Sequence, residues 1–309
     1  AAGFVWGRGT LDTKNLGVLF LLALDTLLKE GARFRRPLIF LAVPDEETGG
    51  QAGMRWLTEH YLAELDPEWV WDEGSGGLAG VFGERVMFGI AVAEKQIQHL
   101  RLIATGDPGH ASMPHDNNAV AALVAALERI RRRPRPLRVT PVAAALFRNI
   151  ADAQKFPASF LLRHVDNPLV QRLIGRKLSG DRLLSAILHD TISLTVLRAG
   201  YKVNVIPERA EAEIDCRLLP DTDAAEFRGW LEARIADPRV RIEVGESSPP
   251  SGVAPMAGPC YAAVQRAVAA HAPGAGLFPL LMPGATDGRY FRQRGYAAYG
   301  FGPGILARE

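Results

Sequence analysis

Cysteine is scarce in this chain, and neither sign of charge dominates it. Cys216 and Cys260 are the two cysteines among 309 residues, and no CxxC or Cys/His spacing of a zinc knuckle occurs. The formal net charge of +2 is too small a bias to indicate a nucleic-acid partner. The densest basic stretch, residues 129–138, reads as a solvated helix end rather than a polyanion site. We therefore expect a cytoplasmic protein with two reduced thiols.

A long apolar run is also lacking. The most apolar stretch, residues 16–28, is interrupted by Asp25 and is shorter than the roughly 20 apolar residues that a membrane span needs. We expect a helix buried against a sheet there, and no membrane partner. The sequence begins with Ala rather than Met, which leaves targeting unpredicted.

The first part of the chain alternates helical and strand-like patterns. Residues 16–30 and 53–64 predict helices, residues 37–43 (PLIFLAV) predict a strand buried on both faces, and residues 69–71 predict a short strand. This rhythm is typical of an α/β fold with a mostly parallel sheet flanked by helices. The same style returns from about residue 250, with a helix at 259–271 and a strand at 297–301. We therefore predict one discontinuous domain from residues 1–94 plus 250–309.

A different pattern fills residues 95–249. Strands are predicted at 96–105, 192–199, 203–205, 211–218 and 240–244, and helices at 118–131 and 220–236. The order strand, helix, two strands, helix, strand favours an inserted α+β domain of ferredoxin-like type. A mostly helical insertion at about 133–190 interrupts it.

Carboxylates follow the predicted strands or precede a helix at three places. Asp12 stands before a helix, Glu46 and Glu47 follow the apolar run 37–43, and Glu73 follows the short strand. Each also fits an ordinary reading, as an acid at a helix start or in a solvated turn. Together, without cysteine, they suit a divalent metal and a water-activating carboxylate. His110 lies in a loop bounded by Gly and Pro, which raises the odds of function only modestly.

The assembled motifs resemble the aminoacylase/carboxypeptidase G family of zinc aminohydrolases, which also includes acetylornithine deacetylase and succinyl-diaminopimelate desuccinylase. The resemblance rests on GRGTLDTK (7–14), PDEETGG (44–50), WDEG (71–74), GHASMPH (109–115), NVIPERAEAEIDCRLLP (204–220) and PGATDGRYF (283–291). The insertion and the last motif look most like the branch of carboxypeptidase S and the N-acyl amino acid hydrolases. The resemblance implies hydrolysis of an amide or peptide bond in an N-acyl amino acid or small peptide that has a free carboxylate.

The resemblance also implies a dinuclear zinc site, with Co²⁺ or Mn²⁺ as alternatives. Asp12 would bridge the two ions, Glu47 would bind one and Glu73 the other. Glu46 would act as the general base. The discontinuous α/β domain would then be the catalytic, metal-binding domain.

The resemblance places the remaining roles on the inserted domain, as a lid and dimerisation domain. His110 would reach into the partner's active site in a homodimer and polarise the scissile carbonyl. Asn204 and Arg217 match positions that bind the substrate carboxylate, and the backbone near Gly284 would assist.

Two metal-binding histidines of the family have no counterpart here. One should lie roughly thirty residues before the bridging Asp, yet eleven residues precede Asp12; the other should follow Gly304, after which five residues remain. We therefore expect a fragment cut at both ends that binds zinc weakly and turns over little substrate. The alternatives are a non-catalytic dimerisation or binding relative, and an unrelated carboxylate–metal phosphoesterase, for which no phosphate-cradling loop is present.

Overall fold

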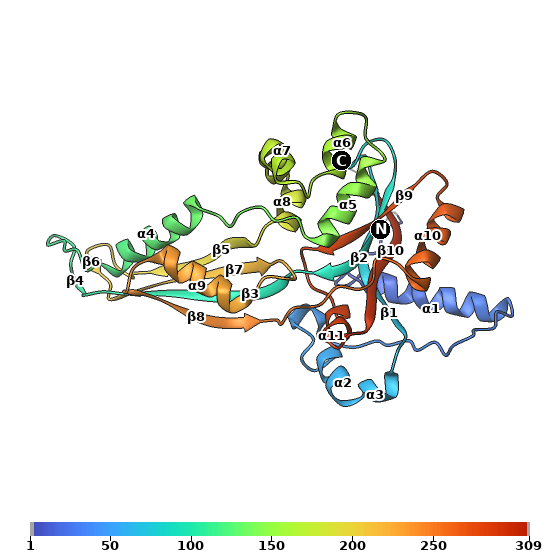
Figure 1. Cartoon of the computed structure of the whole chain (residues 1–309). Coiled ribbons are helices and arrows are strands. Elements are labelled where there is room, and N and C mark those ends of the chain that lie inside the picture. Colours follow the sequence, from blue (N-terminus) through green and yellow to red (C-terminus); the bar gives the residue numbers. More distant parts are fainter. Residues whose placement is uncertain (1–2, 308–309) are drawn as a thin grey trace. The chain divides into compact units, whose positions relative to one another are not determined.

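The computed structural model describes residues 3–307, which divide into two compact units. Unit 1 comprises Ala1–Val92, Ala254–Phe278 and Thr286–Glu309. Unit 2 comprises Ala93–Val253 and Pro279–Ala285. The α/β class predicted from the sequence is confirmed, since helices and mixed sheets alternate along the chain (Figure 1).

Unit 1 contains helices and most of a four-stranded sheet, whose residues 93–94 and 279–282 belong to unit 2. The helices are α1 (Lys14–Lys29), α2 (Met54–His60), α3 (Leu62–Leu65), α10 (Pro259–His271) and α11 (Gly288–Arg292), with the 3-10 helix η1 (Glu46–Thr48). The sheet contains β1 (Trp69–Ala79), β2 (Met87–Glu94), β9 (Gly276–Met282) and β10 (Ala297–Ala307), in the order β1-β10-β2-β9. Its longest ladder, β1 with β10, is parallel, whereas β2 is antiparallel to both.

A small apolar core holds α2, α3 and α11 against β1 and β10. Met54, Phe291 and Ala298 are buried at its centre, and half-buried side chains such as Val43 and Leu57 pack around them. The core therefore fixes α11 and the segment before η1 beside the start of β1.

Glycines allow β1 and β10 to lie unusually close. A Cβ added at Gly74 would lie 2.4 Å from the carbonyl carbon of Gly300, and one added at Gly300 would lie 2.2 Å from the carbonyl oxygen of Glu73. The ladder shifts register between Asp72 and Ser75 and then continues to Ala79. The prediction that the strand stops at residue 71 is therefore wrong: Asp72 and Glu73 lie within β1, because the glycines keep the backbone pairing possible beyond them.

Two predictions for the first 45 residues are wrong. Residues 37–43 form no strand, and Leu38 and Ile39 are exposed. Helix α1 forms where the sequence predicts it, but none of its residues is buried. The apolar pattern reports the tendency to form an element, while burial needs a facing surface or strand edge, which the described part of the chain does not supply.

Unit 2 contains a four-stranded antiparallel sheet in the order β5-β7-β3-β8. Its strands are β3 (Gln96–Thr105), β5 (Thr191–Ala199), β7 (Arg209–Leu218) and β8 (Val240–Ser247), and its helices α4 (Ala119–Arg132) and α9 (Ala224–Ile235) pack on the sheet. The elements follow one another along the chain in the order that the sequence predicts. A separate two-stranded antiparallel ladder of β4 (Gly109–His110) and β6 (Val205–Ile206) extends beyond the four-stranded sheet.

Capping side chains fix where the helices of unit 2 begin. The Asn118 carboxamide oxygen accepts hydrogen bonds from the backbone N–H groups of Val120 (2.9 Å) and Ala121 (3.2 Å) at the start of α4. The carboxylate of Asp223 accepts one from Glu226 N (2.7 Å) at the start of α9. Alternating apolar residues on β3 and β7 then give these helices a surface to cover.

The segment between α4 and β5 is helical. It contains α5 (Pro141–Ala151), α6 (Ala158–Arg163), α7 (Pro168–Gly180) and α8 (Arg182–Leu188). Helices α5 and α6 contact each other, as do α7 and α8. Within residues 3–307, none of the helices is both long and apolar enough to cross a membrane.

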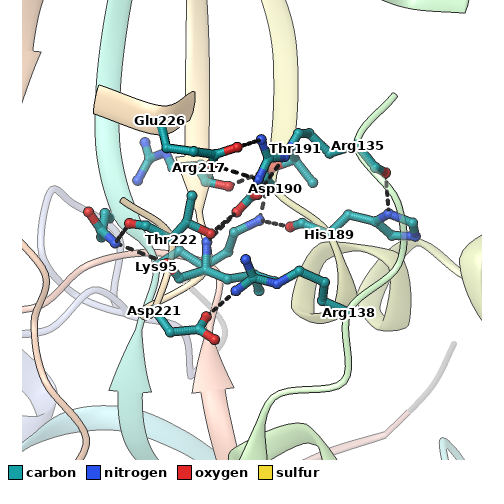
Figure 2. A network of polar contacts seen from close by, with 12 residues as sticks. Lys95, Arg135, Arg138, His189, Asp190, Thr191, Arg217, Asp221, Thr222 and Glu226 are labelled. Carbon is teal, nitrogen blue, oxygen red and sulfur yellow. Dashed lines mark hydrogen bonds and ion pairs between the residues drawn. The ribbon is translucent and has the colours of Figure 1, made fainter. Parts of the chain in front are cut away.

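A buried polar network joins this insertion to the sheet of unit 2 (Figure 2). The ammonium group of Lys95 donates to the carbonyls of Ala186 (2.9 Å) and His189 (2.8 Å) and to the Thr191 hydroxyl (3.0 Å). Asp190 accepts from Leu219 N (2.7 Å) and forms an ion pair with Arg135 (3.2 Å). Because both buried charges are neutralised or fully hydrogen-bonded, they hold the insertion in place rather than loosening it.

Candidate active site

Carboxylates from three separate segments gather in unit 1. Glu46 comes from η1, Asp72 and Glu73 come from β1, and Asp287 immediately precedes α11. Each of Glu46, Glu73 and Asp287 experiences the charge of Asp72 strongly enough to shift its pKa. The predicted base Glu46 and the predicted ligand Glu73 therefore belong to one electrostatic cluster.

A tight turn presents Glu46 and Glu47. Asp45 adopts a left-handed conformation (φ 61°), its carbonyl oxygen accepts from Thr48 N (3.0 Å) and Gly50 N (2.8 Å), and its carboxylate accepts from Ala52 N (2.8 Å). Asp45 therefore stabilises the turn, and its charge also contributes to the raised pKa of Asp287. Glu46 is half-buried and Glu47 is exposed at the first positions of this turn.

Asp72 ties β1 to the start of α11. Its carboxylate accepts hydrogen bonds from the backbone N–H groups of Gly288 (2.5 Å) and Glu73 (2.8 Å). The η1 turn approaches the same point, since a Cβ added at Gly50 would lie 2.9 Å from the Asp287 carboxylate. Glycine is needed there for this reason and for its positive φ of 66°.

Arg289 places a buried cation beside the carboxylates. Its guanidinium donates to the carbonyl of Gly49 (3.2 Å) and lies over the Tyr290 ring at 4.7 Å. The Tyr290 hydroxyl also donates to Gly49. The cation lowers the pKa of Glu46 and of Asp287, but other influences on these groups are larger.

Burial and mutual repulsion raise the pKa of three carboxyl groups. Burial, and then the neighbouring charge of Asp287, raises the pKa of Glu46 to about 7. Burial, followed by Asp72 and Glu46, raises the pKa of Glu73 to about 7. The pKa of Asp287 rises to about 7 for the same reasons, and one of its buried oxygens has no hydrogen-bond partner among the described residues. Added positive charge would relieve this repulsion.

Asp12 and Glu47 line one open hollow with the residues 7–11. The neighbouring Thr13 hydrogen-bonds Glu73 and lowers its pKa, and the charge of Asp12 raises it. The structure therefore brings the predicted metal ligands Asp12, Glu47 and Glu73 to the same region of unit 1 as Glu46.

The donor chemistry of this cluster fits a divalent cation. Carboxylate oxygens suit hard or borderline dications, and the unbalanced negative charge favours one. Among residues 3–307, however, no three His, Cys, Asp or Glu side chains are arranged as a ready-made cage for a metal ion. The site therefore offers the charge and the ligand type without a closed ligand set.

His110 and Asn204 lie side by side in unit 2. His110 pairs with Val205 in the β4–β6 ladder, and Ala111 N donates to the carbonyl of Asn204 (3.1 Å). The exposed His110 ring hydrogen-bonds the Ser112 hydroxyl through Nδ1 (2.7 Å), while the side-chain oxygen of Asn204 is buried without a hydrogen-bond partner in the described part of the chain.

Arg217 lies at the other end of β7. Its guanidinium makes a two-pronged contact with Asp215 (2.8 and 3.1 Å). Arg209, the first residue of β7, is eight residues from Arg217, or roughly 25 Å at about 3.3 Å per residue. One copy of unit 2 therefore does not bring Asn204 and Arg217 together. Gly284 lies on the half-buried loop between β9 and α11.

Sequence reasoning assigned no role to Thr13, Asp72, Asp287 or Arg289. Three of them stand inside the motifs WDEG and PGATDGRYF, so the motifs contained the signal. Adjacent acids such as Asp72 and Glu73 repel each other, which could have marked both as site residues. Only the fold shows that Asp287 and Arg289 belong beside them.

The fold and the site define a class of protein: an α/β unit with a cluster of carboxylates from three segments, and a second unit in which helices pack on an antiparallel sheet. Comparison with protein families identifies the class further. The chain belongs to peptidase family M20/M25/M40, whose model matches residues 1–308.

Curated relatives match nearly the whole chain. They include N-fatty-acyl-amino acid synthase/hydrolase PM20D1 of Xenopus tropicalis (30% identical over 99% of this chain and 60% of the relative). Probable carboxypeptidase S-like 2 of Dictyostelium discoideum is 28% identical over 98% of this chain and 59% of the relative, and Aminoacylase-1 of Pongo abelii is 28% identical over 97% and 64%. The chain thus spans about 60% of the length of such relatives, and the family resemblance read from the motifs is confirmed.

Solved structures agree with the fold. The di-peptidase Dug1p of Saccharomyces cerevisiae matches 97% of this chain and 65% of its own with a TM-score of 0.59 at 13% identity. The M20 family metallo-carboxypeptidase Sso-CP2 of Sulfolobus solfataricus matches 83% of this chain and 60% of its own with a TM-score of 0.52 at 14% identity. At these identities the likeness concerns the fold alone.

Proposed function

We propose that this protein hydrolyses an amide or peptide bond in an N-acyl amino acid or small peptide with a free carboxylate, using divalent metal. The observation that carries the proposal is the carboxylate cluster of unit 1, in which Glu46, Glu73 and Asp287 all have a pKa raised to about 7. Such a concentration of repelling, partly buried acids destabilises the fold unless it serves a cation or a proton transfer. Relatives named as amino acid hydrolase, carboxypeptidase and aminoacylase support the bond type.

Asp12, Glu47 and Glu73 would hold the metal. Asp12 would bridge two ions, for which zinc is the first choice, and Glu47 and Glu73 would each bind one; Asp12 and Glu47 line the same hollow, and Asp12 influences Glu73. When bound, the metal supplies Lewis acidity for the water and the scissile carbonyl. Asp72 and Thr13 would position this set through their hydrogen bonds.

Glu46 would act as the general base. Its carboxyl group is half-buried with a pKa near neutrality, which suits a group that must first accept and then release a proton. It would take a proton from water as the water oxygen attacks the carbonyl carbon. It would then give that proton to the amine nitrogen as the C–N bond breaks.

The α/β domain of residues 1–94 plus 250–309 would be catalytic, and residues 95–249 would be a lid and dimerisation domain. Arg217 would bind the substrate carboxylate with its planar guanidinium, assisted by the backbone near Gly284. Asn204 precedes β6, beyond the opposite end of β7 from Arg217, and is too far away to join Arg217 in one copy. In a homodimer, Asn204 and the carbonyl-polarising His110 of the partner subunit would complete the site.

A second candidate function is binding without catalysis. It is favoured by one observation, the lack of a ready-made three-ligand metal cage among residues 3–307. A non-catalytic relative would keep the fold and bind an acyl amino acid or a second copy.

A substrate panel with the purified 309-residue chain distinguishes the two functions. We expect slow release of amine from N-acetyl and longer N-acyl amino acids, which requires excess zinc because the chain binds zinc weakly, and which a chelator abolishes. Matched substrates whose carboxylate is blocked as an amide should react at least about tenfold more slowly, because the charged contact to Arg217 is lost. Ligand binding without turnover at any zinc concentration would overturn hydrolysis and favour the binding function.

A further inference from the structure

The α6–α7 part of the helical insertion exposes large apolar side chains. Leu169 and Leu173 on α7 are 77% and 71% exposed, and Phe156 and Phe160, before and on α6, are 81% and 52% exposed. Leu169 and Leu173 stand one helical turn apart, so they share one face of α7. Four large apolar residues in eighteen positions exceed the scattered exposure of an ordinary surface.

The exposed leucines do not lie on the face of α7 that packs against the rest of unit 2. Helix α7 already buries Leu178 and contacts α8, and Val165 is buried in the turn that precedes it. Asn167 caps its first turn by accepting from Leu169 N (2.9 Å). The helix is thus anchored on one side, and the leucines project from the other.

Positive charge surrounds the exposed leucines. Arg172, Arg176 and Lys177 are exposed on α7, and within the described part of the chain no ion pair occupies any of them. Residues 153–182 contain six Lys or Arg and two Asp. One of the six, Arg163, is paired with Asp152 at 2.7 Å. The α6–α7 face therefore combines apolar anchors with an excess of unpaired cations.

Helix α1 shows that exposure alone would not give this combination. It also exposes leucines, but its leucine-rich middle, residues 16–28, includes no Lys or Arg, which is the composition of a helix meant for burial. On α7, cations alternate with the exposed leucines instead. Interleaved cations and leucines are typical of helices that lie in a lipid interface.

We propose that the α6–α7 face binds the surface of a bilayer that contains anionic lipids. Leu169, Leu173, Phe156 and Phe160 would enter the boundary between headgroups and acyl chains, while Arg172, Arg176 and Lys177 lie against lipid phosphates. Each cation near an anionic surface contributes about 1 kcal/mol, and each inserted leucine adds about 1.5–3 kcal/mol of apolar burial. This inference replaces the expectation of no membrane partner and is independent of the proposed hydrolysis.

Vesicle sedimentation with the 309-residue chain tests the proposal. We expect binding to vesicles of equal parts phosphatidylcholine and phosphatidylglycerol, little binding to phosphatidylcholine alone, and weakening as salt is added. Leu169→Ser/Leu173→Ser should reduce affinity at least about tenfold through lost apolar burial. Arg172→Gln/Arg176→Gln/Lys177→Gln should reduce affinity and flatten the salt dependence.

The matched control is Leu194→Ser/Leu197→Ser, which removes two leucines of the same unit that are 53% and 54% exposed on β5. Its vesicle binding should equal that of the wild type, and circular dichroism should show all variants folded. Absence of binding to anionic vesicles, or equal losses in control and test variants, would overturn the proposal. So would concentration-dependent self-association that Leu169→Ser/Leu173→Ser abolishes without any vesicle binding, which would make this face a protein interface.

Discussion

The buried charged groups of the two units differ in whether neighbouring groups compensate them. Lys95 and Asp190 in unit 2 are surrounded by partners that satisfy them (Figure 2). Asp287 in unit 1 is 6% exposed, repelled by its neighbours and has an oxygen without a hydrogen-bond partner among the described residues. The first arrangement stabilises a fold, whereas the second stores repulsion that a ligand can relieve.

Arg289 should stabilise the fold by offsetting the repulsion among the clustered carboxylates. Arg289→Met removes a buried charge beside Glu46 and Asp287 and leaves the Gly49 carbonyl with one donor fewer. We expect the free energy of unfolding to fall by roughly 3 kcal/mol in urea titrations. The control Arg266→Met, on the exposed side of α10, should change it by less than about 0.5 kcal/mol. Equal effects of the two substitutions would contradict this role.

Lys95 predicts a pH dependence of stability in alkaline solution. Burial lowers its pKa from 10.5 to about 8 in the folded chain. Below pH 8 the folded and unfolded chains are both protonated, and the cost of burying the charge is present in full. Between pH 8 and 10.5 the unfolded chain holds more protons than the folded one, so stability rises with pH, by at most about 1.4 kcal/mol per pH unit.

The comparison with Lys95→Met isolates this contribution. Burial raises the pKa of the Cys216 thiol and of the Tyr261 phenol to about 12 each. These two groups make stability fall as the pH rises, but they are present in both proteins and cancel in the comparison. The difference in unfolding free energy between wild type and variant should therefore grow in favour of the wild type above pH 8. A difference that stays constant from pH 7 to 10 would show that the lysine is not charged and buried as described.

Sequence motifs singled out the carboxylates that the proposed site uses. Glu46, Glu47, Glu73 and Asp12 stand in acidic motifs next to predicted elements, and the structure gathers them in unit 1. The buried Asp287 could not be singled out, because desolvation depends on segments more than 200 residues apart in sequence.

At the scale of elements, the contact between β1 and β10 positions the carboxylates. Asp72 and Glu73 keep their places because the two strands pair through glycines where side chains would collide. Gly300→Ala would put a Cβ 2.2 Å from the Glu73 carbonyl oxygen, and backbone atoms have no room to move aside. We expect a loss of several kcal/mol of stability, or failure to fold, measured by thermal melting.

The matched substitution is Gly302→Ala on the same strand. A Cβ there would lie 4.0 Å from the Ser75 carbonyl oxygen, which is an ordinary contact. Its melting temperature should stay within a few degrees of the wild type. If Gly300→Ala melts like Gly302→Ala, the close approach of β1 and β10 is not real.

Helices were predictable where local signals define them. Asn118 and Asp223 cap α4 and α9, and α10 begins at Pro259 and ends at His271 as expected. Strands depend on partners far away in sequence. The run 37–43 therefore looked like a buried strand without becoming one, and β2, which is buried along its whole length, was not predicted.

At the scale of the whole molecule, the residues to which we propose roles come from both units. Arg217 and His110 lie at opposite ends of unit 2, so the proposed site needs a second copy. Mixing inactive His110→Ala with inactive Glu46→Gln should restore part of the activity, because hybrid dimers contain one site with neither substitution. A fully active wild type that sedimentation shows to be strictly monomeric would contradict a role for His110 across the interface.

The central claim is that the carboxylate cluster of unit 1 binds metal and performs hydrolysis with Glu46 as base. The most direct measurement determines zinc content and N-acetyl amino acid hydrolysis together for Glu46→Gln, Glu47→Gln and the exposed control Glu64→Gln. We predict that Glu46→Gln keeps the wild-type zinc affinity and loses about 10²- to 10⁴-fold in turnover, that Glu47→Gln binds zinc more weakly than the wild type, and that the control changes neither. Wild-type turnover in Glu46→Gln, or unchanged zinc in Glu47→Gln, would contradict the account.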